Sequence, residues 1–438
     1  MEKQTNQDSE VIREKMKERP LNKRRLLRRT LLTALMAVVF GTVACLTFLL
    51  LEPIISNRLY PEEPPEIIEF NEEATEEILP EDMFADDSEM QSETQEPAVL
   101  EDEQIERVLA AFKLDIDDYL SMNNALLEVA KEAQRSMVTV VGVSSDVDWF
   151  NNTYESESTT SGVIIDDKNK ELLILVNINS IAQAETIRVI FCDGSQHEAT
   201  IRQQDKTTGL AVLSVSQEGI KITTMEAIKI MQFGSSEGSS LMGIPIIALG
   251  RPVSNADSIA YGMVTSVAGQ VNLVDARYKL LTTDIYGSSG ATGILINIRG
   301  RMIGLIDNNY NSSDTKNLIS AIGISDLRKL IEKMSNNNDI AYFGIYSMDV
   351  TQQANEEAGV PFGAYITEID LDSPAMDAGI QSGDVIIKVN DVEILQNKEL
   401  ADVLMDSLPE QILRITLMRQ SPEGYSAMTL NVTLRERE

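Results

Sequence analysis

Short apolar runs separated by turn residues fill the chain from Met137 to Ile298. Runs of about four to eight residues of this kind, bounded by Gly, Asn, Asp and Ser, are typical of β-strands. They predict an all-β domain of the barrel kind over residues 136–335, which ends in a helix from Ser325 to Met334. The runs are MVTVVGV, SGVII, LLILVNI, IRVIF, LAVLSV, IPIIALG, YGMVTSV and GILINI.

After the linker of Asn336, Asn337 and Asn338, the pattern changes again. Residues 340–435 mix strands with two helical stretches, one of them from Lys398 to Ser407. We expect this part to form a second, smaller α+β domain.

A helical pattern precedes the barrel domain, over residues 104–135. Its apolar residues recur at spacings of three and four, which predicts one hydrophobic stripe along a helix. The stripe is expected either to pack on the folded domain, which we favour, or on a sister chain. Its members are Ile105, Val108, Leu109, Phe112, Ile116, Tyr119 and Leu120.

The longest apolar run, from Leu31 to Leu51, has 21 residues and no charge. A helix of about 20 such residues crosses the core of a bilayer. Basic residues precede the run and acidic ones follow it, so the positive-inside rule leaves residues 1–30 as a cytoplasmic tail and the bulk of the chain outside the cell membrane. A cleaved signal peptide is the alternative, but the run is too long and lacks a cleavage site.

The net charge is −32, and most of the excess lies in one segment. Residues 52–106 contain 20 acids and one base, Arg58. Residues 52–103 are also rich in proline and poor in aromatic residues, so we expect a disordered acidic stalk. Such a charge distribution repels phosphates, which excludes nucleic acid as a partner.

The two cysteines, Cys45 and Cys192, lie in unrelated contexts and predict neither a disulfide framework nor a metal site. We expect no cofactor and no metal.

The order of the strands and their motifs resembles the HtrA (DegP/DegQ-like) family of trypsin-like serine proteases. In that family two β-barrels precede one or more PDZ domains. The resemblance covers about 300 residues, from Leu126 to Leu434. It implies a mostly β fold: a trypsin-like double β-barrel and then a PDZ domain (α+β), here preceded by one transmembrane helix and the stalk. Its firmest motifs are Ser161 to Ile165, Gly209 to Leu213, Ala248 to Pro252, Gly262 to Ser266 and Thr283 to Asn297.

The resemblance also implies where a catalytic triad would lie. Where the family has its histidine, in T-N-x-H-V-V, this chain has Asn179; where the acid precedes L-A-V-L, it has Gly209. The serine position holds Thr292, and the glycine-proline stretch after it is one residue short. An amide neither takes nor returns a proton near neutral pH, so we expect no triad activity.

Other parts of that site are incomplete as well. Gly290 and the amide of Thr292 retain the places of an oxyanion hole, although the shortened turn weakens this expectation. Asp205 has no histidine to orient. The single histidine, His197, follows a hairpin signal in what the resemblance implies is an outer strand, so a surface position is expected. A lysine approaching Ser288, Ser289 or Thr292 in space remains an alternative source of activity.

The C-terminal domain resembles a PDZ domain from Ala341 to Leu434. The resemblance implies a carboxylate-binding loop at Tyr342, Phe343, Gly344 and Ile345, where successive backbone amides turn inward. It also implies that the next strand offers an edge to an extended peptide. Leu400 and Leu404 are expected either to line an apolar pocket or to belong to the core.

Three functions follow as hypotheses. The favoured one is a membrane-anchored HtrA-like pseudoprotease that binds C-termini or unfolded segments of extracytoplasmic proteins, in envelope protein quality control. The second is an active serine-type endopeptidase with a non-standard nucleophile. The third is a regulatory subunit in a homo- or hetero-oligomer with HtrA-type protomers.

Overall fold

The computed structural model describes residues 35–37, 40, 42, 66–70, 115–147 and 153–437. The chain divides into two units, Met1–Pro65 and Glu66–Glu438. The predicted cytoplasmic tail, nearly all of the predicted transmembrane run and most of the predicted stalk lie outside the described residues. In the described ranges, no helix has both the length and the apolar character that a membrane span requires.

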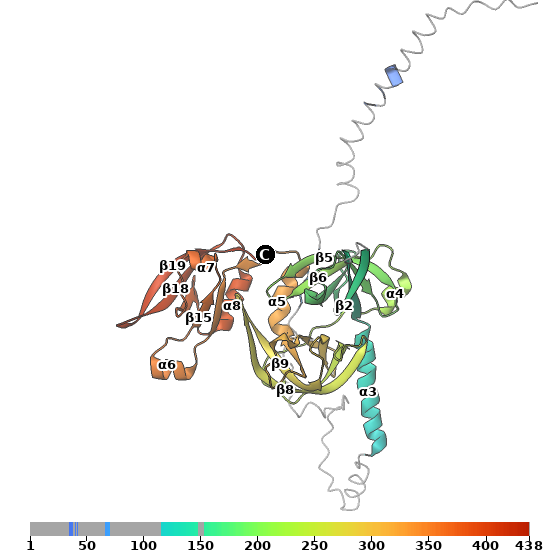
Figure 1. Ribbon diagram of the computed structural model, residues 1–438, viewed down its shortest axis with the longest axis horizontal. Coiled ribbons are helices and arrows are strands. Elements are labelled where there is room, and N and C mark those ends of the chain that lie inside the picture. Colours follow the sequence, from blue (N-terminus) through green and yellow to red (C-terminus); the bar gives the residue numbers. More distant parts are fainter. Residues whose placement is uncertain are drawn as a thin grey trace, which may run out of the picture. The chain divides into compact units, whose positions relative to one another are not determined.

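Two closed six-stranded barrels form the first part of the larger unit. Figure 1 labels β2, β5 and β6 in one barrel and β8 and β9 in the other. The first has the strand order β1-β2-β3-β6-β5-β4 and closes between β4 and β1. Its strands are β1 (Met137–Val147), β2 (Thr153–Asp166), β3 (Glu171–Asn177), β4 (Thr186–Ile190), β5 (Gln196–Asp205) and β6 (Leu210–Ser216).

The second barrel has the order β10-β11-β12-β9-β8-β7 and closes between β7 and β10. All neighbouring strands in both barrels are antiparallel, and the double barrel predicted from the sequence is confirmed. The strands are β7 (Pro245–Arg251), β8 (Ser258–Leu273), β9 (Ala276–Tyr286), β10 (Thr292–Asn297), β11 (Met302–Ile306) and β12 (Leu318–Gly323).

The uninterrupted apolar runs arise because some strands are buried on both faces. In β3, Leu172 and Ile174 join the interior cluster of the first barrel, whereas Leu173 and Leu175 join a cluster shared with the second barrel. Side chains alternate between the faces of a strand, so one run supplies both cores. These two cores hold the ends of β3, β6 and β10 in place, and the candidate site lies at those ends.

Helix α5 (Ile324–Ser335) follows the second barrel and contacts strands of both barrels. The sequence predicts this helix from Ser325 to Met334. Its buried residues recur at three- and four-residue spacing and belong to the shared cluster, as expected for an amphipathic helix. They include Ile324, Leu327, Leu330, Ile331 and Met334.

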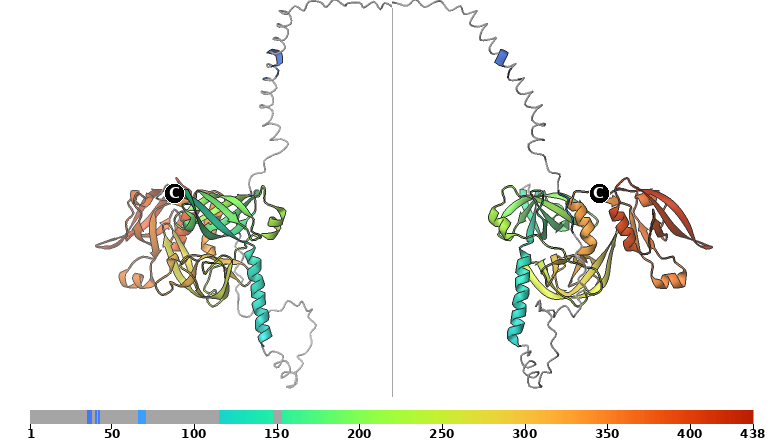
Figure 2. Two further views of the ribbon diagram at one scale, coloured as in Figure 1. Left: turned by 45° about the vertical axis from the view of Figure 1, so that its right-hand side comes forward. Right: turned by 180° about the vertical axis from the view of Figure 1, so that it is seen from behind.

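Helix α3 (Ile116–Gln134) precedes β1 and begins in a capping box formed by Asp115 and Asp118. The side chains it buries are Ala130 and Ala133, near its C-terminal end. Figure 2 shows the opposite end of the helix extending away from the barrels. The predicted docking stripe is therefore wrong over its described part, because Ile116, Tyr119 and Leu120 are exposed. The other members of the stripe lie outside the described residues.

Residues 66–70, which the sequence places in the disordered stalk, pack on α5 instead. Ile68 is 3% exposed, and the ring of Phe70 stacks on Phe233 with a centroid distance of 4.6 Å. The backbone of Ile68 forms two hydrogen bonds with the side chain of Asn336, at 3.0 and 2.9 Å. The expectation of disorder failed here because the acidic composition hid two apolar anchors.

The second part of the larger unit is the α+β domain expected from the sequence. Its main sheet has the order β14-β15-β16-β18-β19, which leaves β14 at an edge. It has three short helices where the sequence predicts two. The elements are β13 (Ala341–Tyr342), β14 (Ile345–Asp349), α6 (Gln352–Ala358), β15 (Ala364–Ile369), α7 (Pro374–Asp377), β16 (Val385–Val389), β17 (Val392–Glu393), α8 (Asn397–Asp406), β18 (Ile412–Ser421), β19 (Gly424–Thr433) and β20 (Arg435–Glu436).

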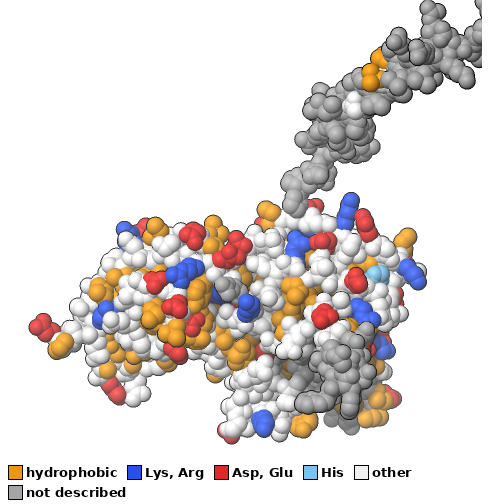
Figure 3. Space-filling view, turned by 45° about the horizontal axis from the view of Figure 1, so that its top comes forward, with side chains coloured by type: hydrophobic (Ala, Val, Ile, Leu, Met, Phe, Trp, Pro, Cys, Tyr) orange, Lys and Arg blue, Asp and Glu red, His pale blue; other side chains and the backbone are white. Residues whose placement is uncertain are grey.

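The surface of the folded unit mixes acidic, basic and hydrophobic side chains over the face shown in Figure 3. The excess of acid in the sequence therefore does not gather there into one patch.

Candidate functional site

Asn179 lies at the end of β3, in the short 3₁₀ helix η2 (Ile178–Ile181). Asn177 begins this helix, and its side-chain oxygen accepts the N–H of Asn179 at 3.1 Å. Asn179 is exposed. The turn therefore presents an amide at the position that the family resemblance assigns to a histidine.

Gly209 directly precedes β6 and has a φ of 70°, in the left-handed region. A Cβ at Gly209 would lie 2.2 Å from Nδ2 and 2.7 Å from Cγ of Asn179. Positions 179 and 209, thirty residues apart in sequence, thus face each other directly. Two positions so placed suit an acid that orients a base, but here neither side chain is ionisable.

Asp205, the nearest acid before β6, has other partners. Its Oδ2 accepts the N–H and the hydroxyl of Thr208, at 3.0 and 2.6 Å. Its Oδ1 lies 3.5 Å from Nη1 of Arg437, and Asp205 is 1% exposed. Asp205 therefore closes a turn and joins the end of the chain to the first barrel.

Thr292 is the first residue of β10 and is half-buried. Its hydroxyl oxygen accepts the backbone N–H of Ser161 at 3.2 Å. Gly293 must be glycine, because it has a φ of 133° and a Cβ there would lie 1.9 Å from the carbonyl oxygen of Leu249. The hydroxyl of Thr292 is thus held against β2, and its oxygen is the acceptor in this contact.

The turn before Thr292 is tight. The N–H of Ala291 donates to the carbonyl of Ser288 at 3.2 Å. A Cβ at Gly290 would meet no atom within 4 Å, so the candidate oxyanion-hole position borders open space.

The alternative nucleophiles have no lysine partner in the part of the chain that the structure describes. Ser288 accepts a hydrogen bond from the hydroxyl of Ser254 at 2.8 Å. No hydrogen bond of Ser288, Ser289 or Thr292 within the described ranges involves a lysine.

His197 lies on β5 opposite Val189 of β4 and is half-buried. Its ring centroid is 5.7 Å from that of Phe191, in a tilted arrangement. The preceding turn is fixed by Asp193, whose carboxylate accepts the hydroxyls of Thr224 and Ser195 at 2.6 and 2.7 Å. The imidazole thus packs beside the ring of Phe191 on an outer hairpin.

The loop between β13 and β14 brings three successive amides onto one carboxylate. The N–H groups of Phe343, Gly344 and Ile345 all donate to Asp275, at 2.8 to 3.0 Å. Gly344 has a φ of 89°, and a Cβ there would lie 2.2 Å from Cβ of Ser373, so only glycine fits. The loop therefore has the geometry of a carboxylate site. Asp275, which the sequence does not mark as part of this loop, occupies it.

The other predicted peptide-binding residues are packed inside the domain. Leu400 and Leu404 are 1% and 3% exposed and belong to the core with Phe343 and Ile345. The side chain of Tyr342 donates to Asp370 at 3.0 Å. Burial, followed by Asp370, raises the pKa of Tyr342. Of the predicted residues, the amides of Phe343, Gly344 and Ile345 thus contact the carboxylate. Leu400 and Leu404 pack in the core beneath this loop.

Asn397, which sequence analysis missed, joins α8 to the edge strand. Its side chain bonds the hydroxyl and the carbonyl of Ser347, at 2.6 and 2.9 Å, and its N–H donates to Asp349 at 2.7 Å. An asparagine at a helix start is the only sequence signal for it.

Comparisons with known proteins agree with this geometry. The trypsin-like peptidase domain family matches residues 160–305, and the PDZ domain family matches residues 365–419. The chain is 26% identical over 328 residues to the serine protease Do-like HtrA of Lactococcus lactis subsp. cremoris, covering 69% of this chain and 77% of that protein. It is also 26% identical over 298 residues to the serine endoprotease DegS of Escherichia coli, covering 65% and 79%.

Among solved structures, the HtrA-type protease AlgW with a decapeptide matches with a TM-score of 0.54 and 20% identity, over 72% of this chain and 99% of that one. This likeness concerns the fold. The double barrel, the domain after it and the relatives by sequence lead to one conclusion: the chain belongs to the HtrA family.

Proposed function

We propose that this protein is an HtrA-type pseudoprotease that binds C-termini or unfolded segments of other proteins through its PDZ domain. The observation that carries the proposal is the pairing of Asn179 with Gly209, which puts no ionisable group at either of these two facing positions. An un-ionised hydroxyl without a base attacks an amide too slowly to support proteolysis near neutral pH.

The contacts of Thr292 support the same proposal. Its oxygen accepts the N–H of Ser161, which occupies one of its two lone pairs and holds the hydroxyl against β2. The active alternative needs a base at this hydroxyl, and the described residues offer none through a hydrogen bond.

The carboxylate loop supports the binding half of the proposal. Phe343, Gly344 and Ile345 converge on a carboxylate, which is the group that ends every peptide. The AlgW relative, with a bound decapeptide, has the same fold. A peptide that adds to the edge of β14, in place of the contacts that Asp275 and Asn397 make there, would extend the sheet by main-chain hydrogen bonds.

The proposed location is the outer side of the cell membrane, with an anchor at residues 31–51. This part rests on the uncharged apolar run and the basic residues before it. Envelope protein quality control, or regulation of active HtrA-type protomers in an oligomer, is the role that suits such a protein.

Two assays on the purified full-length chain in detergent test the proposal. Unfolded casein is incubated with the wild type and with Thr292→Ala, and we expect no cleavage by either. Fluorescein-labelled random decapeptides with a free C-terminus are expected to bind, and the same peptides with an amidated C-terminus are not. Cleavage that disappears in Thr292→Ala, or equal binding of both peptide forms, contradicts the proposal.

A further inference from the structure

The turn of the β8–β9 hairpin reaches the carboxylate loop and fills it. Leu273 pairs with Ala276, so the turn consists of Val274 and Asp275. Asp275 has a φ of 57°, which an aspartate tolerates better than most residues, and it is 3% exposed. A residue of the second barrel is thereby buried in the binding loop of the PDZ domain.

Asp275 makes the contacts that the last residue of a peptide would make. Its Oδ1 accepts the N–H of Ile345 at 3.0 Å, and its Oδ2 accepts the N–H of Phe343 at 2.8 Å. Gly344 donates to both oxygens at 2.9 Å. In return, the N–H of Asp275 donates to the carbonyl of Ile345 at 2.9 Å, as the first rung of an added strand would.

The charge of Asp275 is compensated within the interface. Nη2 of Arg437 lies 3.8 Å from Oδ2 of Asp275, and Nη1 of the same side chain lies 3.5 Å from Oδ1 of Asp205. The side chain of Arg437 is 6% exposed, and both carboxylates are buried. Burial raises the pKa of Asp275, and Arg437 opposes this shift. The guanidinium of Arg437 thus lies between Asp205 of the first barrel and Asp275 of the second.

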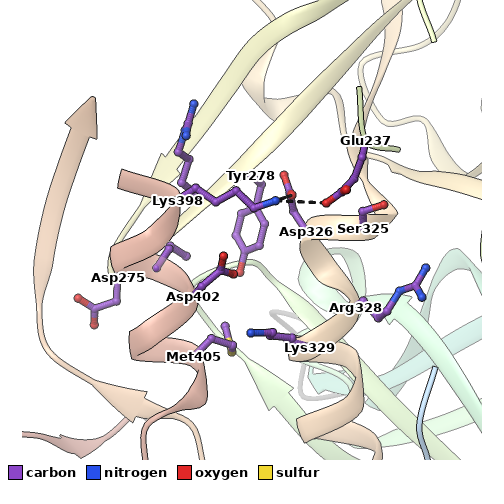
Figure 4. Close-up of a pocket in the computed structure, with 13 residues that line it drawn as sticks. Glu237, Asp275, Tyr278, Ser325, Asp326, Arg328, Lys329, Lys398, Asp402 and Met405 are labelled. Carbon is purple, nitrogen blue, oxygen red and sulfur yellow. Dashed lines mark hydrogen bonds and ion pairs between the residues drawn. The ribbon is translucent and has the colours of Figure 1, made fainter. Parts of the chain in front are cut away.

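Other polar contacts also join the PDZ domain to the barrel part. Arg277 of β9 lies 2.9 Å from Asp349, with side chains 18% and 31% exposed, and Lys329 of α5 lies 2.9 Å from Asp406. Lys398 of α8 lies 3.2 Å from Glu237 and 4.0 Å from Asp326, and it is about half exposed. Figure 4 shows this cluster beside a cavity of about 240 Å³, with Asp275 directed away from it. An exposed ion pair such as that of Lys398 contributes little, so Asp275 and the neighbouring Arg277 form the main polar contacts that an opening would break.

We propose that Asp275 is an internal ligand that closes the carboxylate loop. A peptide carboxylate binds only after the β8–β9 turn has left, so capture of a peptide separates the PDZ domain from the second barrel. This inference rests on the proposed peptide binding and adds its regulation. Only molecules in which the loop is free bind peptide. The apparent Kd therefore equals the Kd of the free loop divided by the fraction of molecules in that state.

The test compares two glycine substitutions in the full-length protein. Asp275→Gly removes the internal carboxylate and suits the positive φ. The matched control is Asp257→Gly, because Asp257 also has a φ of 57°, belongs to the same barrel and is exposed. Asp275→Asn, which keeps the shape and loses the charge, is the second variant.

Two readouts are needed. Hydrogen exchange at the amides of residues 343–345 reports whether Asp275 holds the loop. Anisotropy with the fluorescein-labelled random decapeptides reports its effect on binding. We expect exchange at these amides to accelerate at least tenfold and the peptides to bind at least tenfold more tightly in Asp275→Gly. We expect a smaller change in Asp275→Asn and none in Asp257→Gly.

Each other outcome is informative. Unchanged exchange in Asp275→Gly overturns the assignment of Asp275 as the ligand. Faster exchange with unchanged affinity overturns the regulation and leaves the proposed peptide binding in place. If no variant binds the free-acid peptides better than the amidated ones, the proposed function fails, and the regulation fails with it.

Discussion

The side chain of Asn179 fills the space that a side chain at Gly209 would need. A Cβ at 209 would lie 2.2 Å from Nδ2 of Asn179. In the family that the chain belongs to, an ionisable pair would meet here. In this protein the amide of Asn179 meets Gly209 instead. The amide occupies the space that an acidic side chain at position 209 would need.

This relationship predicts a measurable coupling between the two residues. Gly209→Ala should destabilise the first barrel by about 1 to 2 kcal/mol through its positive φ, and by more through contact with Asn179. In the Asn179→Ala background the contact part should vanish. Hydrogen exchange of the β3 and β6 amides measures the free energy of opening.

Gly194→Ala is the control for that cycle. Gly194 has a φ of 81°, and a Cβ there meets nothing within 4 Å, so it reports the backbone strain alone. If Gly209→Ala costs no more than Gly194→Ala, the described contact between positions 179 and 209 is absent in solution.

Much of the fold could be predicted because each apolar run carries its own signal. β3 and β7 are apolar on both faces, and their runs predict strands directly. The pairing of positions 179 and 209 could be predicted only through the family resemblance. Nothing local in the sequence brings the end of β3 to the start of β6.

The role of Asp275 could not be predicted at all. It lies in a two-residue hairpin turn, where an aspartate is ordinary. Its partner loop begins 68 residues later, and no periodicity or motif connects the two. The docked residues Ile68 and Phe70 were missed for a related reason, because their anchors on α5 lie more than 250 residues away.

The pair of Asp384 and Arg419 is expected to stabilise the PDZ sheet. Two hydrogen bonds of 2.7 Å join them, and Asp384 is 1% exposed. Arg419→Met leaves a buried carboxylate without its partner, which should cost about 3 kcal/mol. Exchange of the β18 and β19 amides measures this loss.

Arg414→Met is the matched control, because Arg414 pairs with Asp391 at the surface of the same sheet. We expect no measurable change from it. An equal effect of both substitutions would show that the bidentate pair is no more important than an exposed one.

The docking of residues 66–70 on α5 predicts protection of individual amides. The N–H of Ile68 donates to Asn336 and that of Phe70 to Glu332, so both should exchange slowly. Ile68→Ala should release the segment and speed both amides, because Ile68 is its buried anchor. Ile67→Ala, at a residue 72% exposed, should leave them protected. Fast exchange in the wild type would contradict the docking.

The turn before His197 predicts a pH dependence. Hydrogen bonds from Thr224 first, and then from Ser195, lower the pKa of Asp193 from 3.8 to about 2. A carboxyl group with a lowered pKa stabilises the folded state above its unfolded value of about 4, and this is lost as the pH falls through about 2.

NMR titration of the Asp193 carboxyl carbon tests this directly. Thr224→Val should move the pKa upward toward 3.8, and by more than Ser195→Ala does. A pKa that stays near its wild-type value in Thr224→Val would show that the hydroxyl of Thr224 does not cause the shift.

The central claim is that the scaffold has no activated nucleophile. The most direct measurement is the intact mass of the full-length protein after incubation with a fluorophosphonate, beside an active HtrA-type protease as positive control. Since the described residues place no base in a hydrogen bond with Thr292, we predict no added mass under conditions that label the control fully. A stoichiometric adduct on Ser288, Ser289 or Thr292 would contradict it.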